Sequence, residues 1–226
     1  MEDFAAFARL VDALRPWLGH LVVVGGWAHR LHRFHPLAHA PEYLPLRTRD
    51  ADLAFSLDAP LSGDMAGALD KAGFTQELLG EHAPPVTHYR LGGEDAGFYV
   101  EFLTPLHGDG LTRKGEPDAT LSRAGITAQK LRYLELLLAS PWTVSVGPDR
   151  GVPLTEPLDV FVPNPVGFIV QKLLIHGERD PHKKAQDVLY IHDTFELFGA
   201  SLDVLRALWA DEVRPVMPAR TARRAE

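Results

Sequence analysis

The chain of 226 residues contains no cysteine, and this absence limits the chemistry that it can carry. Without cysteine there is no disulfide framework and no cysteine-based zinc site, a composition that fits a cytoplasmic protein. The sequence also lacks an apolar run of eighteen or more residues and a basic leader followed by an apolar segment, so we expect neither a membrane span nor a signal peptide. The formal net charge of −7 argues against broad, non-specific binding of nucleic acid, but it leaves room for a local basic groove.

Hydrophobic residues make up 46% of the chain, which is enough to build a real core. Strand-like apolar runs and helix-like repeats alternate up to Pro163-Asn164-Pro165, and the segments after this point have helical spacing. We therefore expect an α/β (α+β) protein with one domain over residues 1–163 and a C-terminal helical bundle over residues 164–226.

A glycine pair follows the first strand-like run. Residues 21–24 are four apolar residues that favour a strand, Gly25 and Gly26 come next, and the residues after Gly26 have helical spacing. The order predicts a strand, a tight turn and a helix. Backbone N–H groups at such a helix start are unpaired and favour an anionic group, typically a phosphate. A turn without any binding role is the alternative.

Two aspartates begin the next strand-like run. Asp50 and Asp52 are two residues apart, so a strand would direct both carboxylates to one face. Like charges that close are unfavourable unless a cation lies between them, and a hard divalent ion is the natural occupant. The pair therefore predicts a Mg²⁺ site, with Mn²⁺ as a second choice. The alternative is a salt bridge to Arg47 or Arg49.

A third acidic residue lies within a later apolar run. Residues 87–91 and 98–103 read as a hairpin, and Glu101 is the one carboxylate in its second strand. A lone Glu in such a run needs a partner or a metal ion.

An apolar strand, a Gly-Gly turn, Asp50-Ala51-Asp52 on the next strand and an acid on a later one resemble the DNA-polymerase-β-type nucleotidyltransferase superfamily. The resemblance implies a nucleotidyltransferase fold, in which a mixed β-sheet is flanked by helices. It implies that Asp50, Asp52 and Glu101 are the catalytic residues and hold the metal ion, and that Gly25 and Gly26 contact the nucleotide. The reaction implied is transfer of a nucleoside monophosphate from an NTP, such as ATP, to a hydroxyl acceptor.

The C-terminal half carries a second resemblance. Gln171-Lys172-Leu173-Leu174 followed by Arg179-Asp180 and Lys183-Lys184-x-x-Asp187 is similar to the helical half of AbiEii-type toxin nucleotidyltransferases. The likeness implies that Lys172, Lys184 (or Lys183) and Asp187 bind the nucleotide, that the acceptor is an RNA end or a protein, and that an antitoxin protein is a partner. The alternative is ion pairing between Lys183 or Lys184 and Asp187 on a solvated helix face.

Two other functions fit the same motifs. Gly-Gly-Trp-Ala before an Asp-x-Asp strand is also similar to enzymes that nucleotidylate antibiotics, which would make the acceptor an aminoglycoside-like small molecule. A catalytically inactive nucleotide-binding module is the other candidate. Relative to the superfamily, Gly26 stands where many members have Ser, and the interval from Gly26 to Asp50 is long.

Three further expectations concern structure. Leu131, Leu134, Leu137 and Leu138 have helical spacing and predict a helix over 128–139. The Gly, Pro and charged residues of 104–125 predict a long loop, whose Arg113 and Lys114 are either solvated or reach a triphosphate. The remaining candidates are histidines, for which we expect partly exposed positions rather than a zinc site: His29, His32, His35 and His39.

Overall fold

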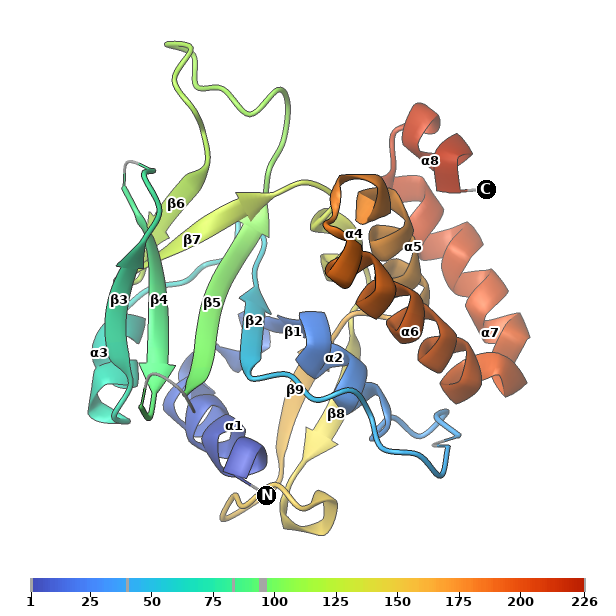
Figure 1. The fold of residues 1–226 in the computed structure, drawn as a ribbon, viewed down its shortest axis with the longest axis horizontal. Coiled ribbons are helices and arrows are strands. Elements are labelled where there is room, and N and C mark those ends of the chain that lie inside the picture. Colours follow the sequence, from blue (N-terminus) through green and yellow to red (C-terminus); the bar gives the residue numbers. More distant parts are fainter. Residues whose placement is uncertain (1, 40, 83, 94–96, 226) are drawn as a thin grey trace.

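The computed structural model describes the whole chain except residues 1, 40, 83, 94–96 and 226. The described residues form a nine-stranded mixed sheet flanked by helices, with the C-terminal helices gathered at one side (Figure 1). The strands are β1 (Val22–Val24), β2 (Asp50–Ala54), β3 (Thr75–Leu79), β4 (Val86–Leu91), β5 (Phe98–Pro105), β6 (Thr120–Arg123), β7 (Ile126–Leu131), β8 (Trp142–Val146) and β9 (Leu158–Val162). The helices are α1 (Glu2–Ala13), α2 (Gly25–His32), α3 (Met65–Lys71), α4 (Glu135–Leu138), α5 (Pro165–Ile175), α6 (Pro181–Phe198), α7 (Leu202–Ala207) and α8 (Ala219–Ala225). The expected fold class is confirmed.

The middle of the sheet is where distant segments of the chain meet. The strand order is β3-β4-β5-β2-β1-β9-β8, and β7 continues along the far end of β5 with β6 beside it. β2 runs antiparallel to β1 and parallel to β5. The glycine turn after β1, the aspartates of β2 and the single acid of β5 are therefore delivered to neighbouring strands.

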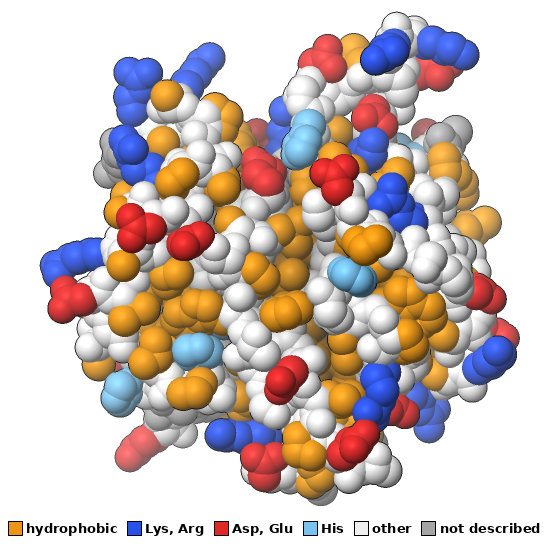
Figure 2. All heavy atoms as spheres, turned by 180° about the vertical axis from the view of Figure 1, so that it is seen from behind, with side chains coloured by type: hydrophobic (Ala, Val, Ile, Leu, Met, Phe, Trp, Pro, Cys, Tyr) orange, Lys and Arg blue, Asp and Glu red, His pale blue; other side chains and the backbone are white. Residues whose placement is uncertain are grey.

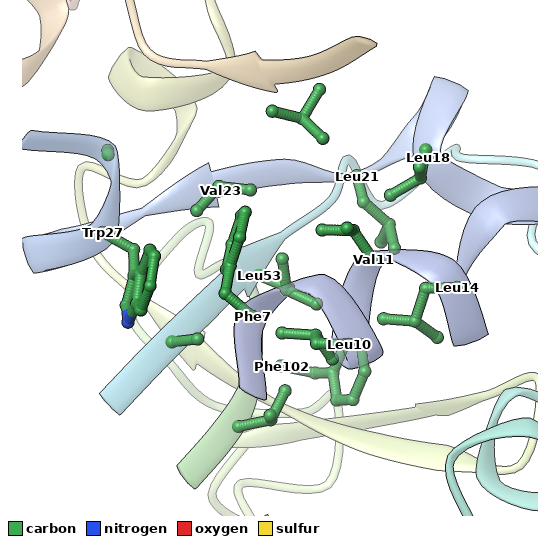
Figure 3. Close-up of a cluster of buried hydrophobic side chains, with 14 of the residues drawn as sticks. Phe7, Leu10, Val11, Leu14, Leu18, Leu21, Val23, Trp27, Leu53 and Phe102 are labelled. Atoms are coloured by element: carbon green, nitrogen blue, oxygen red, sulfur yellow. The ribbon is translucent and has the colours of Figure 1, made fainter. Parts of the chain in front are cut away.

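One face of these central strands is covered by α1. Its residues Phe7, Leu10 and Leu14 are fully buried, together with Leu53 of β2 and Phe102 of β5 (Figure 3). The Phe7 ring stacks on the Trp27 ring of α2 at 4.3 Å between centroids, and stacked pairs of this kind add to the energy of apolar burial. Because this face forms the main core, the polar residues of β2 and β5 are left to the opposite face.

The prediction of a helix over residues 128–139 is wrong for the first half of that range. Ile126–Leu131 is strand β7, which pairs parallel with β5, and only Glu135–Leu138 is helical. Between them Tyr133 has a φ of +62°, which a continuous helix cannot contain. Thus Leu131 belongs to the strand, while Leu134 and Leu137 are buried around the short helix.

The loop expected over 104–125 is also shorter than predicted, because Thr120–Arg123 forms β6 and pairs antiparallel with β7. Strand β3 was not expected; it is an edge strand with mostly exposed residues, so it lacks the alternation that reveals a half-buried strand. Near the C-terminus, Ala222 of α8 is buried in an apolar cluster that is formed mostly by side chains of the C-terminal helices.

Within the part of the chain that the structure describes, no helix is long and apolar enough to cross a membrane. Figure 2 shows the rear face, where hydrophobic side chains are interspersed with charged and polar ones.

Candidate active site

Three carboxylates lie on the face of the sheet opposite α1. In the parallel pairing of β2 and β5, Asp52 is directly opposite Glu101 and Asp50 is opposite Tyr99. Val100 and Phe102, the neighbours of Glu101, are fully buried in the core on the other face. Glu101 therefore lies on the same face as Asp50 and Asp52, whereas the chemical roles of the three residues stay predictions.

Asp52 is hard to ionise in this position. Burial raises the pKa of Asp52 to about 7, and the nearby charges of Glu101 and Asp50 act in the same direction, against weaker opposing effects of Lys172 and Lys183. A carboxyl group that is hard to ionise beside two other acids indicates a local excess of negative charge. Such a site favours a bound cation.

The start of α2 lies next to these acids, because Val24 at the end of β1 is opposite Asp52. Gly25 has a φ of +63°, and a Cβ at this position would lie 2.1 Å from Asp52 Oδ2, so only glycine fits. Gly26 and Trp27 in the first turn of the helix are buried, yet the N-cap residue Val24 offers no side-chain cap. A buried helix start that is left uncapped is suited to an anion.

The glycine turn and the acids share one cavity of about 640 Å³. The sheet provides one wall and α5 and α6 provide another, so the C-terminal helices fold back over the site (Figure 1). The polar side chains on the cavity wall are Thr48, Asp50, Asp52, Glu101, Gln129, Lys130, Arg132, Gln171, Lys172, Glu178, Arg179, Lys183, Gln186, Asp187 and Tyr190.

The helical wall contains a buried ion pair. Lys172 Nζ of α5 lies 2.7 Å from Asp187 Oδ1 of α6, and Arg179 Nε lies 3.2 Å from Asp187 Oδ2. Both Lys172 and Asp187 are less than 5% exposed. Burial lowers the pKa of Lys172, while the Asp187 carboxylate acts in the opposite direction. The ammonium group is thus held in place at the cavity by its partner.

A comparison with known proteins shows the family to which the chain belongs. A family model described as nucleotidyltransferase matches residues 2–214. This chain belongs to that nucleotidyltransferase family. Its structure is similar to that of an antigenic nucleotidyltransferase-like protein from Paracoccidioides brasiliensis, with 15% sequence identity, a TM-score of 0.43, and coverage of 86% of this chain and 76% of that chain. A comparison with curated proteins gives no match.

In this nucleotidyltransferase the basic residues of α6 differ in position. Lys183 lines the cavity, whereas Lys184 is half-buried and does not. Among the described residues, Asp187 forms ion pairs with Lys172 and Arg179. The alternative interpretation, in which Asp187 pairs with Lys183 or Lys184, is therefore wrong. Arg113 and Lys114 are also absent from the cavity wall.

Two of the four histidines differ from expectation. His29 and His32 are fully buried rather than partly exposed, because both lie on the face of α2 that packs against the rest of the protein. His29 Nε2 lies 3.1 Å from Asp193 Oδ2, and His32 Nε2 lies 2.8 Å from the Pro163 carbonyl oxygen. These contacts make the two histidines structural residues.

Sequence reasoning missed two residues at the glycine turn. A Cβ on Gly26 would lie 2.6 Å from Thr48 Cγ2 and 2.7 Å from Tyr190 Oη. Tyr190 is about one helical turn after Asp187 and shares a face of α6 with it, whereas Thr48 lies in the irregular segment before β2. The spacing from Asp187 places Tyr190 on the cavity side of α6, but its contact with the glycine turn depends on how α6 packs against α2.

The side chains of the site provide only some of the ligands that a magnesium ion needs. In the described ranges, no group of three or more His, Asp or Glu side chains converges closely enough to hold a metal ion alone. Magnesium is usually held by one or two carboxylates, with water and substrate phosphates as the other ligands. Asp50 and Asp52, beside an anion-binding helix start, match that arrangement. Arg47, which the alternative paired with these aspartates, forms an ion pair with Asp3 at 2.8 Å.

Proposed function

We propose that this nucleotidyltransferase transfers a nucleoside monophosphate from an NTP to a hydroxyl acceptor, with Mg²⁺ as its cofactor. One observation supports the proposal above all: the buried, uncapped start of α2 and the carboxylates of Asp50 and Asp52 line the same cavity. The first feature is suited to an anion and the second to a cation. A metal-bound triphosphate satisfies both at once.

Each part of the site then has a role. The backbone N–H groups at Gly25 and Gly26 would bind phosphate oxygens, and Lys172 would offset negative charge on the triphosphate. Asp50 and Asp52, with Glu101 beside them, would hold Mg²⁺, which when bound supplies charge neutralisation at the reacting phosphate and activates the attacking hydroxyl. Glu101, whose side chain is 37% exposed, can instead accept the proton of that hydroxyl. Glu101 is supported by His88, whose Nε2 lies 3.4 Å from its Oε1.

For the acceptor we propose an RNA end or a protein, as the resemblance to AbiEii-type toxins implies, with an antitoxin protein as a partner. Five basic side chains line the cavity beside five acidic ones, and basic groups next to carboxylates that hold a metal ion would suit an anionic substrate. The basic side chains are Lys130, Arg132, Lys172, Arg179 and Lys183.

The test is a labelling experiment. The protein is incubated with Mg²⁺ and each α-labelled NTP in turn, in the presence of total RNA, a protein extract or an aminoglycoside mixture. We expect label in RNA or protein, release of pyrophosphate, and loss of both in Asp52→Asn. Label only in the small-molecule pool would identify an antibiotic-modifying type of enzyme. NTP binding without label in any pool would identify an inactive nucleotide-binding module.

A further inference from the structure

The side chain of Tyr190 on α6 is packed between α2, which follows the first strand of the sheet, and α5. Only 3% of the residue is exposed. Its ring lies 4.8 Å from the His29 ring and 6.2 Å from the Phe168 ring, and Lys172 Nζ lies 4.7 Å from its centroid. A ring that contacts α2, α5 and an ammonium group has little freedom, so the position of its hydroxyl is fixed.

That hydroxyl is directed at the start of α2. A Cβ added to Gly26 would lie 2.7 Å from Tyr190 Oη, which is closer than real Cβ contacts come. Tyr190 also lines the cavity that contains Gly25, Asp50 and Asp52. The phenol therefore reaches the same place as the unpaired N–H groups of the helix start.

The hydrogen bonds of Tyr190 leave its proton available. Gln186 Nε2 donates to Tyr190 Oη at 3.0 Å, so the phenol oxygen is the acceptor in that bond. In the described part of the chain, no acceptor is recorded for the Tyr190 proton. Burial raises the pKa of Tyr190 to about 12, so the hydroxyl is protonated at neutral pH. A buried donor without an acceptor is unfavourable, and a ligand oxygen would relieve this.

We propose that Tyr190 donates its hydroxyl proton to a phosphate oxygen of the substrate bound over the Gly25-Gly26 turn. This inference rests on the proposed function and adds a substrate-contacting residue to it. The turn would then bind phosphate with backbone donors from α2 and a side-chain donor from α6. It also explains why residue 26 is glycine, since any side chain there would displace the tyrosine hydroxyl.

The test uses Tyr190→Phe, which removes the hydroxyl and keeps the ring. Binding is measured by calorimetry with Mg²⁺ and, as separate ligands, inorganic tripolyphosphate and each of the four NTPs. Loss of one hydrogen bond to a charged group should weaken binding about 10- to 100-fold. Because the contact is to phosphate, the factor should be the same for every ligand that the wild type binds.

Tyr89→Phe is the matched control, because the Tyr89 hydroxyl is also buried but belongs to β4 on the α1 side of the sheet. It should leave every affinity unchanged. Wild-type affinity in Tyr190→Phe would overturn the inference while leaving the proposed function intact, and a lower melting temperature with unchanged affinity would assign the hydroxyl to Gln186 and folding alone. If the wild type binds none of the five ligands, the proposed function fails and the inference fails with it.

Discussion

At the scale of single residues, Asp52 is the most informative side chain, because burial, together with the nearby charges of Glu101 and Asp50, raises its pKa to about 7 and a bound cation would favour its ionised form. Asp52→Asn removes one negative charge with almost no change in volume. We expect the apo protein to be at least as stable as the wild type, because a buried carboxyl with a raised pKa destabilises the folded state at neutral pH. The thermal stabilisation by Mg²⁺ plus NTP should disappear. Activity should fall by more than the roughly 10- to 100-fold that loss of an outer-shell partner costs.

The control for this variant is Asp58→Asn, an exposed aspartate just after the same strand. It should respond to Mg²⁺ and NTP as the wild type does. An Asp52→Asn protein with a full metal response would remove Asp52 from the metal site.

Lys172 has two roles that mutation can separate. Lys172→Ala should lower the free energy of unfolding by about 3–5 kcal/mol, because it leaves the buried Asp187 with Arg179 as its remaining ion-pair partner. The double variant Lys172→Met, Asp187→Leu replaces the pair by apolar groups and should recover most of that stability. It should not recover NTP affinity. Urea denaturation and calorimetry measure the two quantities, and normal NTP binding by the double variant would make the pair purely structural.

At the scale of elements, the sequence predicted what local patterns control. The glycine turn, the strand with Asp50 and Asp52 and the strand with Glu101 are short segments with their own periodicity. Strand β7 could not be predicted in this way, because its parallel pairing with β5 joins Gln129 to Leu103, which local spacing does not reveal. Tyr190 was missed for a similar reason: its place at the turn depends on how α6 packs against α2.

Helix α5 depends on its N-cap, Asn164, the residue just before Pro165. The fully buried Asn164 accepts a hydrogen bond from Gly167 N at 2.8 Å and donates one to the Ala139 carbonyl oxygen at 2.8 Å. Asn164→Ala loses the cap and leaves a carbonyl unpaired, so the free energy of unfolding should fall by about 2–3 kcal/mol. Asp180 caps the exposed start of α6, and Asp180→Ala should lower the free energy of unfolding by clearly less. Equal losses in urea denaturation would show that the second bond of Asn164 contributes nothing.

At the scale of the whole molecule, α6 joins the helical half to the sheet. Asp187, Tyr190 and Asp193 follow one another along this helix and contact Lys172, the glycine turn and His29, respectively. Tyr190 also belongs to the same buried cluster as the core of the sheet. The boundary between residues 163 and 164 stays a prediction, and the site lies across it.

This junction also makes stability depend on pH. Burial lowers the pKa of His32 to about 3 and that of His29 to about 4, from an ordinary value of 6.5. Below pH 6.5 the unfolded chain therefore binds protons that the folded chain does not, and stability falls as the pH falls through this window. The loss from His32 alone should reach about 2 kcal/mol at pH 5.

The measurement is the free energy of unfolding between pH 7.5 and 5, compared between the wild type and His32→Gln. Asp52 acts in the opposite direction, because its raised pKa makes the folded chain bind a proton that the unfolded chain releases above pH 3.8. That contribution is common to both proteins, so the difference between their slopes isolates His32.

The His32→Gln variant should be less stable than the wild type at pH 7.5, because the contact with the Pro163 carbonyl oxygen is altered. It should lose less stability than the wild type on acidification. Parallel curves for the wild type and His32→Gln would mean that the buried imidazole is not neutral in the folded protein.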